Sequence, residues 1–353
     1  MEKFEVNILG CGAAIPIGRH MTTSQLVNVH DKLFMVDCGE GTQTQIWKSG
    51  IKLTNMDNIF ISHAHGDHFF GLVPLLSSLN LMLGRTKDIN VFVPEDLKDI
   101  LMLMLKELCH IPFNVNINTF MGNSNQKIYE DEEMEIETIP LKHDIPCCGF
   151  LFREKPKKRV LLPEKCLSYD IPKRDFKLIK SGNDYILPDG TLISNKELTA
   201  PSEFVPRSYA YCSDTAYNPS MVSQLKDVDL LYHETTFLAN DENRAINAFH
   251  STTHQAANIA KSANARKLII GHYSIRYDDE QQFEQEVKSI FPNAEACNEG
   301  MVLEFKKKNM NNENKLLEYD EVCPYSEGRA AVRKGEFWGY VDENGKLVIT
   351  DLD

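Results

Sequence analysis

Residues 59–71 read Ile-Phe-Ile-Ser-His-Ala-His-Gly-Asp-His-Phe-Phe-Gly, and this stretch is the most informative part of the chain. It opens with three apolar residues, which are typical of a short buried strand. Four potential metal ligands follow within six residues: His63, His65, Asp67 and His68. Imidazole nitrogens and carboxylate oxygens are ligands that zinc accepts. A polar surface loop can also contain such residues, but four of them directly after a strand favour a metal site.

The spacing of these four residues suggests two neighbouring positions for metal. His63 and His65 are two residues apart in an extended segment, so their side chains point the same way. Asp67 and His68 fall in the turn that follows, from which they can reach a second position beside the first. The apolar residues from Phe69 onward are compatible with a helix.

Candidate ligands recur at the ends of other predicted strands. His143 follows the alternating segment 134–139, Asp214 follows 209–212, His233 and Glu234 follow 230–232, and His272 follows 268–270. Between the strands, apolar periodicity predicts helices over 42–48, 69–83, 95–108, 253–263 and 280–290. This alternation indicates a layered α/β fold whose chemistry lies at strand ends.

Composition limits the class of protein. The 353 residues suffice for one large α/β domain and a small appendage. The sequence lacks an apolar run near the roughly twenty residues of a membrane span, and its first residues do not resemble a signal peptide. The N-terminal sequence thus predicts a cytoplasmic location, and the nine scattered cysteines are interpreted as reduced core residues. The net charge of −13 argues against indiscriminate nucleic-acid binding.

Two segments depart from this pattern. Residues 153–180 contain ten basic and four acidic residues, a net charge of +6 inside an acidic protein. Three prolines and weak periodicity predict a protruding arm, the alternative being a solvated loop. Residues 306–315 have the polarity of a linker, and Asn344-Gly345 predicts a hairpin turn in a β-rich tail. The expected domains are 1–305, with an inserted arm at 153–198, a linker at 306–318 and a tail at 319–353.

The order of these residues resembles the metallo-β-lactamase superfamily, and in detail the ribonuclease Z family of tRNA 3′-processing endonucleases. The motifs that carry the likeness are Asp37-Cys38-Gly39-Glu40-Gly41-Thr42-Gln43, residues 62–72, His233-Glu234-Thr235-Thr236-Phe237, His250-Ser251-Thr252 and His272-Tyr273-Ser274. The likeness runs from about Phe4 to Phe305. It implies a four-layer αββα metallo-β-lactamase fold, to which the basic arm and the small C-terminal β appendage are added.

The resemblance also implies roles for individual residues. His63, His65 and His143 would hold one Zn²⁺, Asp67, His68 and His272 a second, and Asp214 would bridge the two. Mn²⁺ or Fe²⁺ are alternatives, since ligand type narrows the choice of metal without fixing it. Asp67 would orient or deprotonate the attacking water, and His250 paired with Glu234 would protonate the leaving oxygen. His233 is left open between phosphate binding and support of the fold. Without motif support, four histidines are expected to be structural: His20, His30, His110 and His254.

The implied activity is that of a zinc-dependent phosphodiesterase that removes 3′ trailers from precursor tRNA and leaves a 3′-hydroxyl. The basic arm would neutralise RNA phosphates. The resemblance further implies a homodimer in which the arm of one subunit serves the site of the other. No membrane partner is expected. A protein contact through the tail, which resembles a single WG repeat centred on Trp338-Gly339, remains an option beside a merely packed appendage.

Departures from the family pattern keep alternatives open. Ser213-Asp214-Thr215 stands where Gly-Asp-Thr is usual, and the arm lacks the Gly-Pro motif, although Ile179-Lys180-Ser181-Gly182 is a loose match to the stretch after it. A two-zinc hydrolase of a small phosphodiester or other ester is therefore the second hypothesis. A di-iron redox enzyme ranks lower, because it usually has Glu at the position of His65 and a flavin domain. A fourth reading, a catalytically inactive RNA-binding or scaffold protein, is disfavoured because all seven ligands are present.

Overall fold

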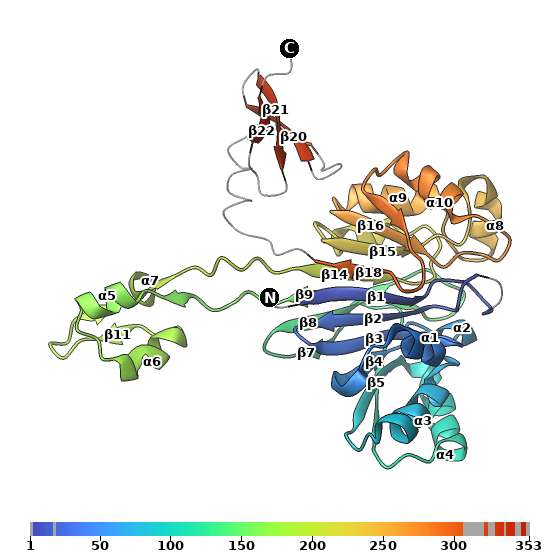
Figure 1. The fold of residues 1–353 in the computed structure, drawn as a ribbon, viewed down its shortest axis with the longest axis horizontal. Helices are drawn as coiled ribbons and strands as arrows, with labels where there is room; N and C mark the ends of the chain where they lie inside the picture. The colour runs from blue at the N-terminus through green and yellow to red at the C-terminus, as the bar shows by residue number, and fades with distance from the viewer. Residues whose placement is uncertain are drawn as a thin grey trace. The chain divides into compact units, whose positions relative to one another are not determined.

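The computed structural model describes residues 3–16, 19–305, 321–323, 329–334, 337–342 and 347–350 (Figure 1). Contacts divide the chain into two compact units, and the first comprises 1–130, 135–153 and 207–306. The predicted linker at 306–318 and the turn at Asn344-Gly345 lie outside the described residues.

The first unit is built on two seven-stranded sheets. The first sheet has the order β18-β1-β2-β3-β4-β5-β6, with bounds Val302–Glu304, Phe4–Gly10, Ser24–Val29, Lys32–Cys38, Met56–Phe60, Ile89–Pro94 and Val115–Phe120. The second has the order β17-β16-β15-β14-β9-β8-β7, with bounds Ala294–Ala296, Lys267–Gly271, Leu230–Glu234, Ser208–Cys212, Cys148–Glu154, Met134–Pro140 and Lys127–Glu130.

The two sheets pack face to face through buried aromatic side chains. The ring of Phe60 in β4 lies 5.6 Å from that of Phe150 in β9, and Phe34 in β3 lies 6.0 Å from Phe152. Strands buried on both faces read as near-continuous apolar runs, as 33–36 and 268–270 do. The strands are therefore recognisable in the sequence, whereas their pairing is set by contacts between the sheets.

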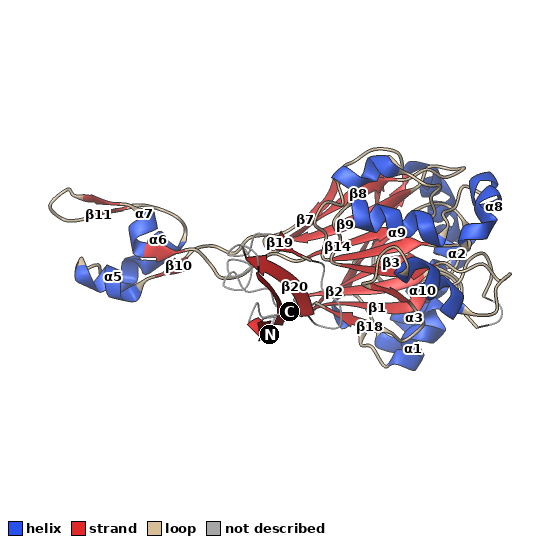
Figure 2. Cartoon of the chain, turned by 90° about the horizontal axis from the view of Figure 1, so that it is seen from above, coloured by secondary structure: helices blue, strands red, loops and turns tan. Residues whose placement is uncertain are grey.

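Helices cover the outer face of each sheet (Figures 1 and 2). On the first sheet these are α1 (Thr42–Ser49), α3 (Leu72–Leu83) and α4 (Lys98–Leu108), whose apolar faces share a core with β1 to β5. On the second they are α8 (Glu242–Asn247), α9 (Thr253–Ser262) and α10 (Glu280–Lys288). Short 3₁₀ turns are η1 (Leu53–Asn55), η2 (Glu95–Leu97), η4 (Pro219–Ser223) and η5 (Ala239–Asp241). The predicted four-layer α/β arrangement is confirmed.

One predicted helix is divided in the structure. The segment expected as a helix from 69 to 83 is a short α2 (Gly66–Phe69) followed by α3, with a break at Gly71. The Gly71 amide donates to the carbonyl of Cys38 at 2.8 Å, and a Cβ on Gly71 would lie 2.1 Å from the Gly39 carbonyl oxygen. This close approach holds the metal-ligand loop against the end of β3.

The second unit includes residues 154–206, which have a small core of their own. Six buried residues form it: Leu161, Cys166, Ile171, Ile179, Ile193 and Leu198. The elements are β10 (Val160–Leu161), α5 (Pro163–Ser168), η3 (Lys173–Asp175), α6 (Phe176–Lys180), β11 (Tyr185–Ile186), β12 (Leu192–Ile193), α7 (Asn195–Leu198) and β13 (Thr199–Ala200). The segment is therefore folded and is not merely a solvated loop.

The described part of the tail is an antiparallel sheet. Its strands are β19 (Glu321–Val322), β20 (Arg329–Lys334), β21 (Phe337–Asp342) and β22 (Leu347–Thr350), in chain order. Ala330, Val332 and Val341 are buried in it. The β-rich character expected of this segment is thus observed.

Candidate metal centre

All seven residues that the family resemblance assigns as ligands lie close together, although they come from five segments. His63 and His65 are in the loop after β4, Asp67 and His68 in α2, His143 in the loop after β8, Asp214 after β14 and His272 after β16. Strands β14, β15 and β16 run parallel, so their carboxyl ends lie at the same edge of the second sheet. His272 adopts a positive φ of 63°, which turns the chain sharply at that edge.

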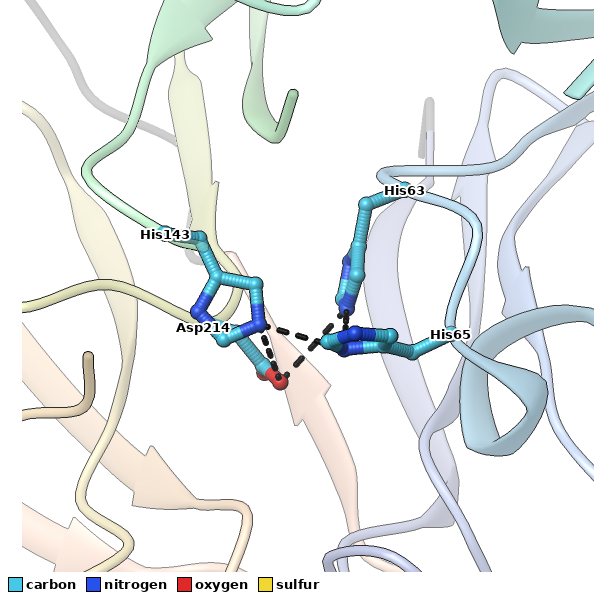
Figure 3. A group of neighbouring side chains, drawn as sticks. All are labelled: His63, His65, His143 and Asp214. Atoms are coloured by element: carbon cyan, nitrogen blue, oxygen red, sulfur yellow. Dashed lines mark hydrogen bonds and ion pairs between the residues drawn. The ribbon is translucent and has the colours of Figure 1, made fainter. Parts of the chain in front are cut away.

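Three imidazoles form the first ligand group (Figure 3). The Nδ1 atom of His65 lies 3.2 Å from Nε2 of His63 and 3.1 Å from Nε2 of His143. Both Nε2 atoms also face the carboxylate of Asp214, with its Oδ2 at 3.6 Å from His63 and 3.9 Å from His143. Histidine ligands alone favour zinc or a late transition metal over Mg²⁺ or Ca²⁺.

Asp67, His68 and His272 form the second group. Oδ2 of Asp67 lies 3.6 Å from Nε2 of His68 and 3.5 Å from Nε2 of His272. Asp214 faces this group too, with Oδ2 at 3.4 Å from His68 Nε2 and Oδ1 at 3.2 Å from His272 Nε2. Its carboxylate therefore stands between the two groups.

Several of these buried atoms have no hydrogen-bond partner within the described residues, namely Nε2 of His68, Nε2 of His272 and Oδ1 of Asp214. A buried polar atom without a partner is costly, by about 1–3 kcal/mol. All three atoms point into the space between the ligand groups. A bound cation would satisfy them, so the residues present fit a metal.

Two of the ligands are in the form that binds metal, whereas His68 is not, because, although burial lowers its pKa, Asp214 and Asp67 outweigh burial and raise that pKa well above its usual value. Although burial raises the pKa of a carboxyl group, His272 and His68 hold the pKa of Asp214 well below its usual range. Burial lowers the pKa of His63 well below its usual value, and the neighbouring His68 lowers it further. An ionised carboxylate and a neutral imidazole are the forms that bind metal.

Glu234 and His250 form a pair beside the ligands. His250 Nδ1 lies 3.1 Å from Glu234 Oε1, and although burial lowers its pKa, the Glu234 charge raises it to about 9. The Glu234 carboxylate also accepts from the amides of Ser251, at 2.7 Å, and Thr236, at 2.8 Å. The imidazole of His250 is thus kept protonated and is 5.4 Å, ring to ring, from His272.

His233, in contrast, belongs to none of the ligand groups that the described residues form. It is fully buried, and its Nδ1 donates to the backbone carbonyl of Glu234 at 2.7 Å. Burial lowers its pKa, which leaves the ring neutral. These contacts favour support of the fold over phosphate binding.

Asp37 is a member of the site for which the sequence motifs predicted no role. A shift of register between β2 and β3 leaves it without a partner strand residue, in a β-bulge with φ of 55°. Bulges re-aim side chains beside active sites. The Asp37 carboxylate accepts from Nδ1 of His68, at 2.7 Å, and so fixes the ring of that ligand. Its place in the Asp-Cys-Gly-Glu-Gly motif was the only signal.

The loop after β1 also reaches the site. The backbone amide of Ala14 donates to Oδ2 of Asp67 at 2.8 Å. At the far end of this loop, His20 lies between two carboxylates, with Nδ1 2.9 Å from Glu299 and Nε2 2.8 Å from Glu280. Burial lowers the pKa of His20, but hydrogen bonds to both glutamates raise it above its usual value.

Cys11, His20 and Glu299 lie close enough to hold a metal, but their chemistry does not favour one. Both ring nitrogens of His20 are engaged by carboxylates, and burial raises the pKa of the Cys11 thiol well above its usual value. His20 and the two glutamates form a partly buried ion pair, and Cys11 lies buried beside them. His30, His110 and His254 belong to none of the ligand groups that the described residues form.

No helix within the described residues is long and apolar enough to cross a membrane.

Comparison with known proteins agrees with this architecture. A metallo-beta-lactamase fold protein from Bacillus subtilis, YhfI, superimposes with a TM-score of 0.61 over 86% of this chain and 100% of its own, at 18% identity. The short form of human tRNase Z superimposes with a TM-score of 0.60 over 85% and 98%, at 24% identity. The chain therefore has the metallo-β-lactamase fold, and its grouped His and Asp side chains fit a metal.

Sequence relatives narrow this class. The chain is 47% identical over 304 residues to ribonuclease Z of Bacteroides fragilis, which covers 86% of this chain and 99% of that protein. It is 48% identical over 294 residues to ribonuclease Z of Phocaeicola vulgatus, covering 83% and 94%. The chain belongs to the ribonuclease Z family and is an endoribonuclease.

Two family models match parts of the chain. The model of the anti-Pycsar protein Apyc1 matches residues 4–164, and that of the WG-containing repeat matches residues 315–336 and 338–350. The second match confirms the WG-like character predicted for the tail.

Proposed function

We propose that this chain removes 3′ trailers from precursor tRNA with two zinc ions, leaving a 3′-hydroxyl. The observation that carries the proposal is the position of Asp214. Its two carboxylate oxygens lie within 3.2–3.9 Å of imidazole nitrogens from both ligand groups. In this proposal the ionised Asp214 side chain would serve both metal positions.

In this proposal His63, His65 and His143 hold one zinc, and Asp67, His68 and His272 hold the other. When bound, such ions would supply an activated water at neutral pH and would stabilise charge on the attacking and leaving oxygens. Asp67 orients the water, because its Oδ2 is held by the Ala14 amide on one side and faces the ligands on the other. The unpartnered atoms of His68, His272 and Asp214 support this assignment.

Glu234 and His250 supply the proton for the leaving oxygen. An RNA hydroxyl is a poor leaving group, so protonation in the transition state contributes about 10²–10⁴-fold. Nδ1 of His250 is bonded to Glu234, which leaves the Nε2 side of the ring to face a substrate. The side chain retains 15% exposure, whereas Glu234 is fully buried. Glu234 thus acts by keeping the His250 imidazole protonated and by fixing its orientation.

The folded segment 154–206 supports RNA as the substrate. Four exposed basic side chains follow one another along η3 and α6: Lys173, Arg174, Lys177 and Lys180. Two other basic residues of the segment hold the fold: Arg159 donates to the hydroxyl and carbonyl of Thr199, each at 2.7 Å, and Lys155 donates to the Asp131 carbonyl at 2.6 Å. The η3–α6 stretch is therefore the part that we assign to phosphate contacts.

We also propose the homodimer that the family resemblance implies, with the arm of one subunit serving the site of the other. A cytoplasmic location is supported by nine free cysteines, eight of them buried, because such thiols persist in a reducing compartment.

Cleavage of a 5′-labelled precursor tRNA by the zinc-loaded protein tests the proposal. We expect one cut directly after the discriminator base, abolished by a chelator and restored by zinc. Turnover of a small phosphodiester without any cleavage of precursor tRNA would favour the second hypothesis, a hydrolase of small esters. Cleavage that survives complete metal removal would contradict the two-zinc assignment.

A further inference from the structure

A buried hydrogen-bond network lies behind the candidate ligands, with Asp37 at its centre. Oδ1 of Asp37 accepts from the amide of Ser62 at 2.7 Å. Oδ2 accepts from the hydroxyl of Ser62 at 2.9 Å, from Nδ1 of His68 at 2.7 Å and from the hydroxyl of Tyr211 at 2.6 Å. All four residues are fully buried. One carboxylate from the first sheet thus gathers donors from the metal loop and from the second sheet.

The same network reaches the other ligand group through Ser62. The Ser62 Oγ atom lies 2.9 Å from Nδ1 of His63. Since Nε2 of His63 faces Asp214 and the other ligands, Nδ1 must carry the ring proton when Nε2 binds metal. Ser62 therefore accepts from His63 and donates its single proton to Asp37. Asp37 therefore orients His68 of the second group by a direct bond, and it orients His63 of the first group through Ser62.

Ser213 completes this arrangement. Its hydroxyl lies 3.1 Å from Ser62 Oγ and 3.5 Å from the Tyr211 hydroxyl, and the residue is 1% exposed. Because the Ser62 proton is already given to Asp37, Ser213 is the donor of the 3.1 Å bond. Ser213 also precedes Asp214 directly and stands where the family pattern has glycine, which has no hydroxyl to donate.

We propose that Ser213 is a positioning residue for the metal centre, since its hydroxyl holds Ser62 in the orientation that fixes the ring of His63. The inference rests on the ligand assignment proposed above and goes beyond it. The effect is confined to one half of the centre: His68 is held by Asp37 without Ser62, whereas His63 depends on Ser62. Loss of partners that orient a metal ligand typically weakens metal binding by about 10–100-fold.

The test is zinc affinity, measured on the full chain by competition with a chromophoric chelator. For Ser213→Ala and Ser213→Gly we expect one of the two zinc ions to bind at least tenfold more weakly and the other to stay within twofold of wild type. The cobalt-substituted protein should show a changed visible spectrum at one site. Unequal weakening of the two ions is a readout that general destabilisation would not give.

Ser208→Ala is the matched control. Ser208 is another buried serine, at the opposite end of β14, and its hydroxyl is bonded to Asp229 at 3.2 Å, outside the network. The Ser208→Ala variant should bind both zinc ions with wild-type affinity. Thermal unfolding identifies any variant that fails to fold. If Ser213→Ala fails to fold, the zinc affinity of Ser213→Gly decides the test.

Wild-type affinity at both sites in the two Ser213 variants would overturn this inference alone. Equal weakening of both sites would also overturn it. A wild-type chain that binds no zinc would overturn the ligand assignment and this inference together, so the two failures are distinguishable.

Discussion

Glu234 Oε1 lies 3.1 Å from Nδ1 of His250, at the edge of the group of candidate metal ligands. The carboxylate is fully buried, and the backbone amides of Ser251 and Thr236 fix it in place. Its charge therefore acts on His250 before any substrate is present. This relationship gives the imidazole a single orientation and a proton to donate.

Replacing His250 by Ala should damage RNA cleavage far more than cleavage of a substrate with a good leaving group. We expect kcat on precursor tRNA to fall by about 10²–10⁴-fold, the usual contribution of a general acid. Hydrolysis of bis(p-nitrophenyl) phosphate should fall less than tenfold, because nitrophenolate leaves without a proton. Glu234→Gln should show the same pattern more weakly.

The control for these variants is zinc content, measured by atomic absorption and expected to be unchanged. A reduction of equal size on both substrates would mean that His250 supports the site and does not protonate the leaving group.

The second prediction concerns a ligand. His65→Ala removes the imidazole whose Nδ1 faces both His63 and His143, so zinc content should fall. Activity should drop by more than the roughly 100-fold that removal of a supporting residue causes. His110→Ala, which removes an exposed imidazole outside the cluster, is the control. Retention of two zinc ions per chain by His65→Ala would refute the assignment of this ligand.

The third prediction concerns the basic stretch of η3 and α6. Changing Lys173, Arg174, Lys177 and Lys180 to Ala should raise KM for precursor tRNA and spare bis(p-nitrophenyl) phosphate. The dependence of log affinity on log salt should become shallower by roughly 0.7–0.9 for each RNA phosphate that the variant no longer neutralises.

A variant with the same change of charge elsewhere controls for the net charge of the protein. Lys98, Lys106, Lys226 and Lys261 are exposed lysines of the first unit. Their replacement by Ala should leave KM unchanged. If both quadruple variants raise KM equally, the stretch is not a specific RNA contact.

The fourth prediction concerns the pH dependence of stability. Burial disfavours charge on His20, but its bonds to Glu299 and Glu280 raise its pKa above the unfolded value. A raised pKa means that the stabilisation is fully present below about pH 6.5. It is lost as the pH rises through the higher folded pKa.

Thermal unfolding of the zinc-loaded protein checks this sign. His20→Gln should melt below wild type at pH 6, on the order of 2–4 °C for each kcal/mol of stability removed. The gap should narrow toward pH 9. A gap that does not change with pH would show that His20 stabilises the loop by packing and not by charge.

Much of the site could be predicted from the sequence because each ligand follows a recognisable strand. His63, His143, Asp214 and His272 all stand directly after apolar or alternating runs, which the structure shows to be strands. The pairing of the strands and the positions of β-bulges could not be predicted from the sequence in the same way. Asp37 acquires its role only because β2 and β3 shift register beside it, which depends on both strands together.

The residues at helix ends predicted the structure less well than apolar periodicity did. At the start of α1, Gly41, with φ of 88°, occupies the cap position without a side-chain hydrogen bond, and the Thr42 hydroxyl donates to the carbonyl of Gly39. The division of α2 from α3 likewise follows from the contact of Gly71 with β3, a tertiary effect. The core of segment 154–206 was not predicted, because its helices are at most six residues long and give little apolar periodicity.

The pairing of β1 with β18 has a consequence for synthesis on the ribosome. Glu5 in the first strand lies opposite Glu304, near the end of the first unit, and the ligands between them are spread from His63 to His272. During synthesis, individual ligand histidines therefore leave the ribosome long before the candidate metal centre is complete. The full set of ligands can therefore assemble only when almost the whole unit has left the exit tunnel.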